Sequence, residues 1–92
     1  MITLIKDCQR IIDNSTYHVQ NDKVLEEAEE YLEVIKENAM PIRILDESVD
    51  VIITAIQKML LEDFTIDDIT KHIAYKIERT FKELGIGEIE WK

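Results

Sequence analysis

Two segments of the sequence decide the fold, residues 24–35 and residues 44–62. They read VLEEAEEYLEVI and ILDESVDVIITAIQKMLLE. In the first segment, apolar residues recur every three or four positions, which is the periodicity of an amphipathic α-helix. The second segment is apolar around most of its circumference, which indicates a helix that is covered on several sides. Pro41, the only proline, lies between them and cannot continue the first helix. The sequence therefore predicts two neighbouring helices joined by a short connection.

Capping residues predict one more helix on each side of this pair. Thr3 can cap a first helix whose apolar residues lie on one side. Thr65 can cap the last helix, and Gly85 can end it in the left-handed conformation that suits glycine. The four helices are expected over residues 3–13, 16–38, 44–62 and 66–84. We therefore expect one domain over residues 1–92, with an all-α, four-helix bundle fold.

The composition argues against some classes of binding partner. Of the 92 residues, 46% are hydrophobic and 34% are charged, which is typical of a globular helical protein. The formal net charge of −9 argues against binding to nucleic acid or to an anionic membrane. A small phosphate ligand stays compatible with that charge, because a bound metal ion reverses the local sign. No apolar run reaches the ~18 residues of a membrane span and no signal peptide is visible, so a cytoplasmic protein is expected.

Two acidic motifs interrupt the apolar pattern. The first reads E-E-x-x-E and consists of Glu26, Glu27 and Glu30; the second reads E-x-x-D and consists of Glu47 and Asp50. Residues three apart share a helix face, and both motifs lie about ten residues, or ~15 Å of helical rise, from the turn. In antiparallel neighbours the motifs would therefore meet side by side. Glu27 also falls at the edge of the apolar sector, where an unpaired carboxylate is costly and needs a cation.

A convergent set of carboxylates predicts a site for a divalent metal ion. Its ligands would be Glu27, Glu30, Glu47 and Asp50. Carboxylate oxygens suit Mg²⁺, which also takes water and phosphate oxygens as ligands, and Mn²⁺ would fit as well. The sequence has no cysteine and histidine set with the spacing of a zinc site, and no glycine-rich phosphate loop. Metal and basic side chains would therefore have to hold any phosphate group.

Basic residues near these motifs are candidates for binding phosphate. Lys76 and Arg79 lie, together with His72, on one edge of the last predicted helix. Lys23 precedes the first motif by one helical turn. The alternative interpretation of these residues is surface charge paired with acidic residues of the same helices.

The motifs and their interval resemble the signature of the MazG-like, all-α nucleoside triphosphate pyrophosphohydrolases. That signature is E-E-x-x-E followed by E-x-x-D. This chain reads Gln20-x-x-Lys23-x-x-Glu26-Glu27-x-x-Glu30, then sixteen residues, then Glu47-x-x-Asp50. The resemblance spans residues 17–84 and includes the basic last helix.

The resemblance implies an enzyme and assigns roles by position. The family fold is a four-helix unit that assembles into homodimers or homotetramers. The family activity is Mg²⁺-dependent hydrolysis of a nucleoside triphosphate, (d)NTP, to the monophosphate and pyrophosphate. The implied metal ligands are Glu27, Glu30, Glu47 and Asp50, and the implied catalytic residues that orient or deprotonate water are Glu26 and Glu30. The implied phosphate-binding residues are Lys23, Lys76 and Arg79.

Two other functions stay open from the sequence. One is a phosphoribosyl-ATP pyrophosphohydrolase-like enzyme. The Tyr-His pair that this branch usually carries after the second motif is replaced here by VIITA at residues 51–55. The other is a non-catalytic acidic helical oligomer that binds a partner or a nucleotide. The closest resemblance is to small, single-domain MazG-like proteins of phage or bacterial type.

The third predicted helix also indicates self-association. Because it is apolar nearly all round, a second chain is expected to cover part of it. Val51, Ile53 and Leu61 are the candidate contact residues, and burial within one chain is the alternative. The tail carries the only tryptophan, Trp91, which is expected to pack loosely on the bundle or on a neighbour. The single cysteine, Cys8, excludes an intrachain disulfide and is expected to be a small buried side chain.

Overall fold

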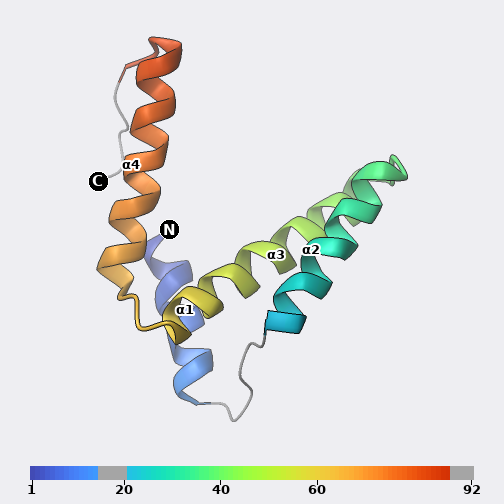
Figure 1. The fold of residues 1–92 in the computed structure, drawn as a ribbon, viewed down its shortest axis with the longest axis horizontal. Coiled ribbons are helices and arrows are strands. Elements are labelled where there is room, and N and C mark those ends of the chain that lie inside the picture. The colour runs from blue at the N-terminus through green and yellow to red at the C-terminus, as the bar shows by residue number, and fades with distance from the viewer. Residues whose placement is uncertain (15–20, 88–92) are drawn as a thin grey trace.

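A computed structural model describes residues 1–14 and 21–87 of the chain. These residues form four α-helices, α1 (Ile2–Asp13), α2 (Asn21–Lys36), α3 (Pro41–Leu61) and α4 (Ile66–Leu84) (Figure 1). No strand occurs within the described ranges. The predicted all-α class and the four helices are therefore confirmed. Trp91 lies outside the described residues, so the expectation for the tail stays a prediction.

Two helices begin earlier than their sequence signals indicated. The prediction of Thr3 as a cap is wrong, because α1 begins at Ile2 with Met1 at the N-cap position and without a side-chain cap. The amide of Ile5 donates to the carbonyl of Met1 at 3.1 Å, so the first helical turn already contains Thr3. Helix α3 begins at Pro41, since a proline at the first position needs no amide donor there.

Both ends of α4 follow the predicted capping chemistry. The Thr65 hydroxyl accepts from the Asp68 amide at 3.0 Å, and the Asp68 carboxylate accepts from the Thr65 amide at 2.9 Å. This reciprocal pair forms a capping box. At the other end, Gly85 takes a left-handed φ of 68°, and the Ile86 amide donates to the Phe81 carbonyl. The predicted roles of Thr65 and Gly85 are confirmed.

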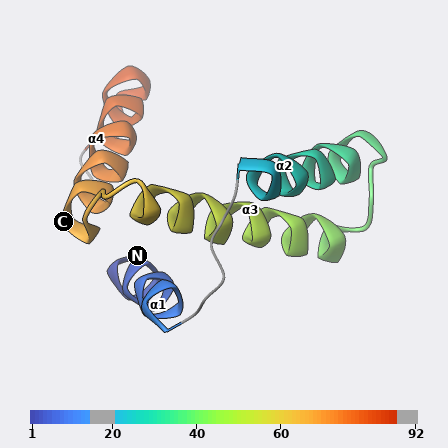
Figure 2. The ribbon, with the colours of Figure 1, turned by 60° about the horizontal axis from the view of Figure 1, so that its bottom comes forward.

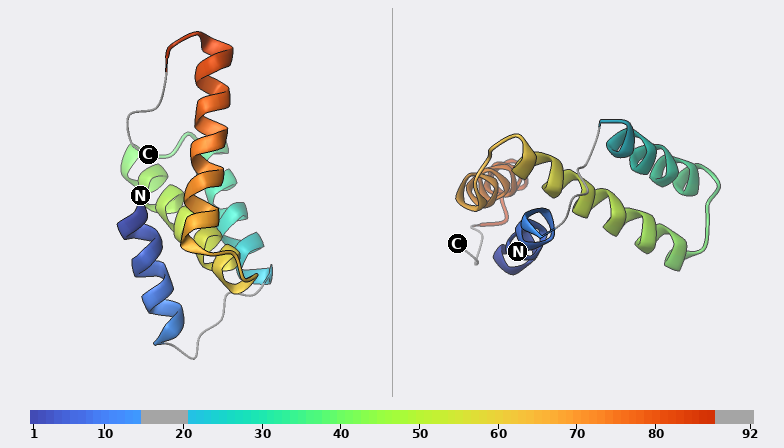
Figure 3. Two further views of the ribbon diagram at one scale, coloured as in Figure 1. Left: turned by 90° about the vertical axis from the view of Figure 1, so that its left-hand side faces the viewer. Right: turned by 90° about the horizontal axis from the view of Figure 1, so that it is seen from below.

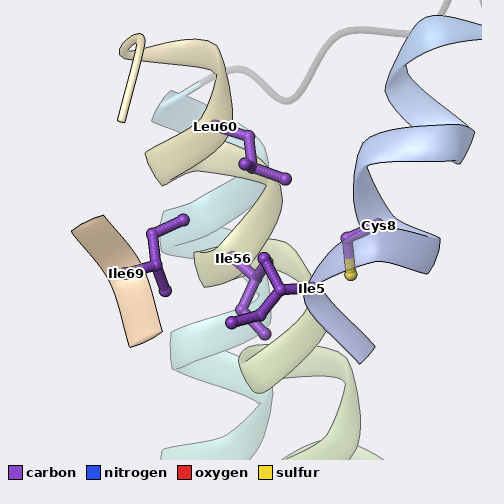
Figure 4. Close-up of a cluster of buried hydrophobic side chains, with 5 residues drawn as sticks. All are labelled: Ile5, Cys8, Ile56, Leu60 and Ile69. Atoms are coloured by element: carbon purple, nitrogen blue, oxygen red, sulfur yellow. The ribbon is translucent and has the colours of Figure 1, made fainter. Parts of the chain in front are cut away.

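The hydrophobic core lies where α1 packs against α4 and the second half of α3. Its buried members are Ile5, Cys8, Ile56, Leu60 and Ile69 (Figure 4). Cys8 is 2% exposed, as expected for a small buried side chain. Loss of water contact is the main cause that raises the pKa of the Cys8 thiol, and the charge of Asp7 adds to it. The core therefore holds α1, α3 and α4 together.

Helices α2 and α3 form an antiparallel hairpin that extends beyond this core. Figures 1 and 2 show α2 beside the first half of α3, on the side of α3 away from α1. Helix α4 leaves the core in another direction and lies apart from α2 (Figure 3). The radius of gyration is 15.1 Å, against about 12 Å for a compact domain of this length. Much of the hairpin surface is thus covered by no other helix of the described chain.

The most exposed apolar side chains of α3 are not the ones that were candidates for a contact between chains. Ile53 is partly buried and packs against the core, which fits the alternative of burial within one chain, and its contact with a second chain stays a prediction. Val51 and Leu61 are half-buried. The exposed large apolar residues of α3 are Ile42, Leu45, Val49 and Ile52. The sequence could not identify this side because the docking position of α1 decides which part of α3 is covered.

None of the helices in the described ranges has both the length and the apolar content needed to cross a membrane. The longest helix, α3, carries Arg43, Asp46, Glu47 and Asp50 within its first half.

Candidate metal centre

Three glutamates from the two hairpin helices converge on one point. Glu27 and Glu30 come from α2, and Glu47 comes from α3. Each offers one carboxylate oxygen, and these three oxygens lie within 4.8 Å of one another. The antiparallel course of α2 and α3 places the two acidic motifs at the same height, as their equal distance from the turn predicts. We refer to Glu27, Glu30 and Glu47 as the glutamate cluster.

The burial of the cluster makes its charge costly. Glu27 is only 7% exposed. Its Oε1 accepts from the Lys23 ammonium at 2.9 Å, but its Oε2 is buried with no hydrogen-bond partner among the described residues. The Oε2 of Glu47 is also buried and has no hydrogen-bond partner among the described residues. Buried carboxylate oxygens without partners are unfavourable, and a bound cation is a partner that such oxygens accept.

The surroundings of Glu30 raise the pKa of its carboxyl, in part through repulsion within the cluster. Loss of water contact is the main cause that raises the pKa of the Glu30 carboxyl. The charges of Glu27, Glu47 and Glu26, and a hydrogen bond with Glu47, raise this pKa further. Carboxylates this close cannot all ionise without cost. The cluster is therefore arranged to take up positive charge, as a proton or as a metal ion.

The other two acidic residues of the motifs lie at the margin of the cluster. Asp50 is exposed, and its carboxylate is not among the three that converge. It follows Glu47 by three residues, which turns it about 60° around α3. Glu26 is exposed as well and lies 3.8 Å from the Lys23 ammonium. The structure thus brings together three of the four predicted ligands and leaves Glu26 accessible to water.

The predicted phosphate-binding residues are divided between two places. Lys23 lies at the cluster, in its ion pair with Glu27. Lys76 and Arg79 are exposed on α4, which lies apart from α2 (Figures 1 and 3). The Arg79 guanidinium lies 6.0 Å from the centre of the Tyr75 ring. Within one chain, therefore, α4 does not place these two cations beside the carboxylates.

Two buried polar residues of α3 extend the polar side of the hairpin. Thr54 and Gln57 are 8% and 9% exposed. Each lies two turns beyond an acidic residue of the second motif, Thr54 beyond Glu47 and Gln57 beyond Asp50, and so shares its side of the helix. The sequence signal for them is their place in the narrow polar strip of an otherwise apolar helix, although no role was predicted. Thr54 and Gln57 therefore place a buried hydroxyl and a buried amide on the side of α3 that carries the second acidic motif.

A separate hollow lies between the end of α3 and α4. Its volume is about 650 Å³, and it is lined by Met59, Phe64, Asp68, Ile69, Lys71, His72, Ile73 and Tyr75. Two charged groups in this lining are engaged locally, since Asp68 caps α4 and Lys71 pairs with Asp67 at 2.9 Å. The hollow contains no member of the glutamate cluster, so the carboxylate chemistry lies elsewhere.

Comparison of the chain with protein family models, with curated proteins and with solved structures finds no match. The candidate site therefore depends on the geometry of the glutamate cluster and on the motifs that form it.

Proposed function

We propose that the chain is a divalent-metal-dependent nucleoside triphosphate pyrophosphohydrolase that converts (d)NTP to (d)NMP and pyrophosphate. The observation that supports this function best is the convergence of Glu27, Glu30 and Glu47, with oxygens of Glu27 and Glu47 buried and without hydrogen-bond partners among the described residues. The order and spacing of the acidic motifs supply the reaction type through their resemblance to the MazG-like enzymes.

The donor set fits a hard divalent cation. All three converging groups are carboxylates, and oxygen ligands favour Mg²⁺, with Mn²⁺ as an alternative. A bound ion of this kind would neutralise charge on a phosphate chain and lower the pKa of a coordinated water molecule. In this proposal the ion is held by Glu27, Glu30 and Glu47, and Asp50 belongs to the ligand set through its motif.

The remaining groups have proposed roles that follow from their exposure. Glu26 is accessible to water, so it can orient or deprotonate an attacking water molecule. Glu30 is the second candidate base, because it belongs to the first motif and its carboxylate lies at the point where the glutamate cluster converges. Lys23 can exchange its contact with Glu27 for a phosphate oxygen when a metal ion takes over that charge.

Lys76 and Arg79 need a second chain to act at this site. They lie on α4, apart from the cluster of their own chain (Figure 1). Their proposed phosphate-binding role therefore requires the homodimer or homotetramer that the resemblance implies, with α4 of another copy near the hairpin.

Pyrophosphate release tests the proposed function. The substrates are the common and modified nucleoside triphosphates together with phosphoribosyl-ATP, each with and without Mg²⁺. We expect Mg²⁺-dependent release from at least one nucleoside triphosphate, and loss of that activity in Glu47→Gln. Glu29→Gln is the matched control, because Glu29 is an exposed glutamate of α2 outside the glutamate cluster. Equal activity of Glu47→Gln and the wild type would contradict the assigned ligands.

A non-catalytic binding module is the second candidate, and the separation of Lys76 and Arg79 from the cluster favours it. In that case Mg²⁺ would raise the melting temperature, because a ligand that binds the folded state stabilises it. No pyrophosphate would be released from any member of the substrate panel. Turnover therefore separates the two functions, and the melting measurement shows whether the ion binds.

A further inference from the structure

The hollow between the end of α3 and α4 is lined by several rings. Its volume of about 650 Å³ falls within the range of about 300–1,000 Å³ that small-molecule sites occupy. Phe64, His72 and Tyr75 bring rings into the lining, beside the apolar side chains of Met59 and Ile69. Phe64 and Tyr75 are each 55% exposed, so much of their ring surface is open to a ligand. Aromatic rings gain stability by packing against another ring, and the lining therefore suits a flat aromatic body.

Two cations continue the same face of α4 beyond the hollow. Lys76 and Arg79 follow His72 by four and seven residues, so they lie about 40° and 20° from it around the helix and about 6 and 10 Å further along. The Arg79 guanidinium lies 6.0 Å from the centre of the Tyr75 ring, which lines the hollow. Among the residues that the structure describes, no acidic side chain forms an ion pair with Lys76 or Arg79. Their positive charge is thus available to an anion at this end of the hollow.

The charges at the other end of the hollow oppose an anion there. Asp68 lines the hollow, and its carboxylate is held in the capping box with Thr65. Lys71 lines the hollow as well, but its ammonium is paired with Asp67. Two acidic groups therefore face one cation at the start of α4. The hollow is negative at this end and positive at the end that carries the two cations.

We infer that this hollow is a binding site for a small aromatic anion, whose ring packs on Phe64 and Tyr75 and whose anionic group lies at Lys76 and Arg79. Aromatic carboxylates and nucleoside monophosphates share this chemistry, which is a flat ring that carries a negative group. The site uses no member of the glutamate cluster and no metal ion. The inference therefore does not depend on the proposed function, and it gives Lys76 and Arg79 a role within their own chain.

The net charge of the chain makes the anionic group a stringent criterion. A chain of net charge −9 repels anions at long range. A neutral ligand with the same ring would therefore bind more tightly than its anionic counterpart unless local cations hold the anion. Preference for the anion thus reports the contribution of Lys76 and Arg79.

Calorimetric titration of the full chain in EDTA tests the inference, because EDTA keeps divalent ions away from the glutamate cluster. The probes are two pairs of an anion and its neutral counterpart, indole-3-acetate with indole-3-acetamide and adenosine monophosphate with adenosine. We expect the anion of at least one pair to bind about tenfold more tightly than its neutral counterpart, which is the effect of one charge-assisted contact. The pair whose anion binds more tightly identifies the ligand as an aromatic carboxylate or a nucleotide.

Substitutions separate the ring contact from the anion contact. The double variant Lys76→Gln/Arg79→Gln should lose the preference for the anion and keep the affinity for the neutral probe. Tyr75→Ala should weaken the binding of both probes of a pair, because both contact this ring. Arg10→Gln/Lys36→Gln is the matched control, since it makes the same change in charge at exposed positions of α1 and α2 and should bind as the wild type does. Circular dichroism should show unchanged helix content in all three variants, because every substituted side chain is exposed.

Three results would overturn the inference. The first is the absence of binding of either anion up to about 1 mM. The second is an equal or higher affinity of the wild type for the neutral probe in both pairs. The third is an anion preference that survives Lys76→Gln/Arg79→Gln, or an affinity that survives Tyr75→Ala, because the ligand would then bind elsewhere on the chain. Phe64→Ala replaces Tyr75→Ala if the latter loses helix content.

Discussion

The Lys23 ammonium lies 2.9 Å from Glu27 Oε1, and it brings a positive charge to a carboxylate that is only 7% exposed. The two residues are one turn apart on α2, so the helix itself sets this contact. Lys23 also lies 3.8 Å from Glu26. In the absence of metal, Lys23 therefore offsets part of the negative charge in the glutamate cluster.

The first prediction is that Lys23→Met destabilises the metal-free protein. Removing one partner of a largely buried ion pair leaves the other charge uncompensated, and the partial exposure of Lys23 reduces the cost to about 1–2 kcal/mol in the free energy of unfolding. Mg²⁺ should restore most of this loss, because it supplies the missing positive charge. Chemical unfolding followed by circular dichroism, with and without Mg²⁺, measures both effects.

Lys71→Met is the matched control for this prediction. Lys71 pairs with Asp67 at the same distance of 2.9 Å, but both side chains are more than two-thirds exposed. Its removal should leave the stability unchanged, since exposed ion pairs contribute little. Equal effects of the two substitutions would mean that Glu27 does not depend on Lys23 for its charge.

The second prediction concerns the repulsion inside the cluster. Glu47→Gln removes a negative charge beside Glu30, whose pKa is raised mainly by loss of water contact and further by the neighbouring glutamate charges. The variant should therefore be at least as stable as the wild type without metal. It should also lose the Mg²⁺-dependent rise in melting temperature, because one ligand is gone. A thermal melt of Glu47→Gln and of the control Glu29→Gln provides the comparison.

A large loss of stability in metal-free Glu47→Gln would contradict this prediction. It would mean that the Glu47 carboxylate holds α3 against α2 as a structural group. The metal proposal would then lose the observation that supports it best.

The glutamate cluster could be predicted because two local regularities determine it. The residues of each motif share a helix face, and both motifs lie equally far from the turn, so an antiparallel hairpin brings them together. Asp50 did not join them, although it lies three residues from Glu47, which is the same separation as between Glu27 and Glu30. Spacing along each helix thus identifies the face that carries the cluster but not every member of the cluster.

The direction of α4 could not be predicted from periodicity. The chain turns between α3 and α4 at Asp63, which takes a left-handed φ of 69°, before the Thr65 cap starts the next helix. That backbone geometry, together with the place of Ile69 in the hydrophobic core with Ile5, directs α4 away from the hairpin. Apolar spacing on α4 identifies the face that packs but does not state which helix it packs against. The separation of Lys76 and Arg79 from the glutamate cluster is therefore set by tertiary contacts, which apolar spacing does not show.

The third prediction uses the capping box at the start of α4. Hydrogen bonds from the Thr65 amide and hydroxyl lower the pKa of the Asp68 carboxyl below its usual 3.8. A carboxyl with a lowered folded pKa stabilises the protein above its unfolded pKa, and this contribution is lost as the pH falls through the folded value. Asp68→Asn should therefore be less stable than the wild type at neutral pH, with the difference disappearing well below pH 3.8. Unfolding curves across this pH range measure it, and a constant difference at all pH values would mean that ionised Asp68 is not the stabilising species.

The fourth prediction tests whether the core at α1 holds the fold together. Ile5 is fully buried and belongs to the hydrophobic core that joins α1, α3 and α4. Ile5→Ala should lower the free energy of unfolding by about 2–5 kcal/mol, because it removes buried methylene groups and leaves a cavity. Ile11→Ala is the matched control on the same helix, since Ile11 is 51% exposed and should cost much less. The melting temperatures of the two variants decide the point. If Ile5→Ala and Ile11→Ala lost equal stability, α1 would not be packed through Ile5, and the position of α4 relative to the hairpin would lose its physical basis.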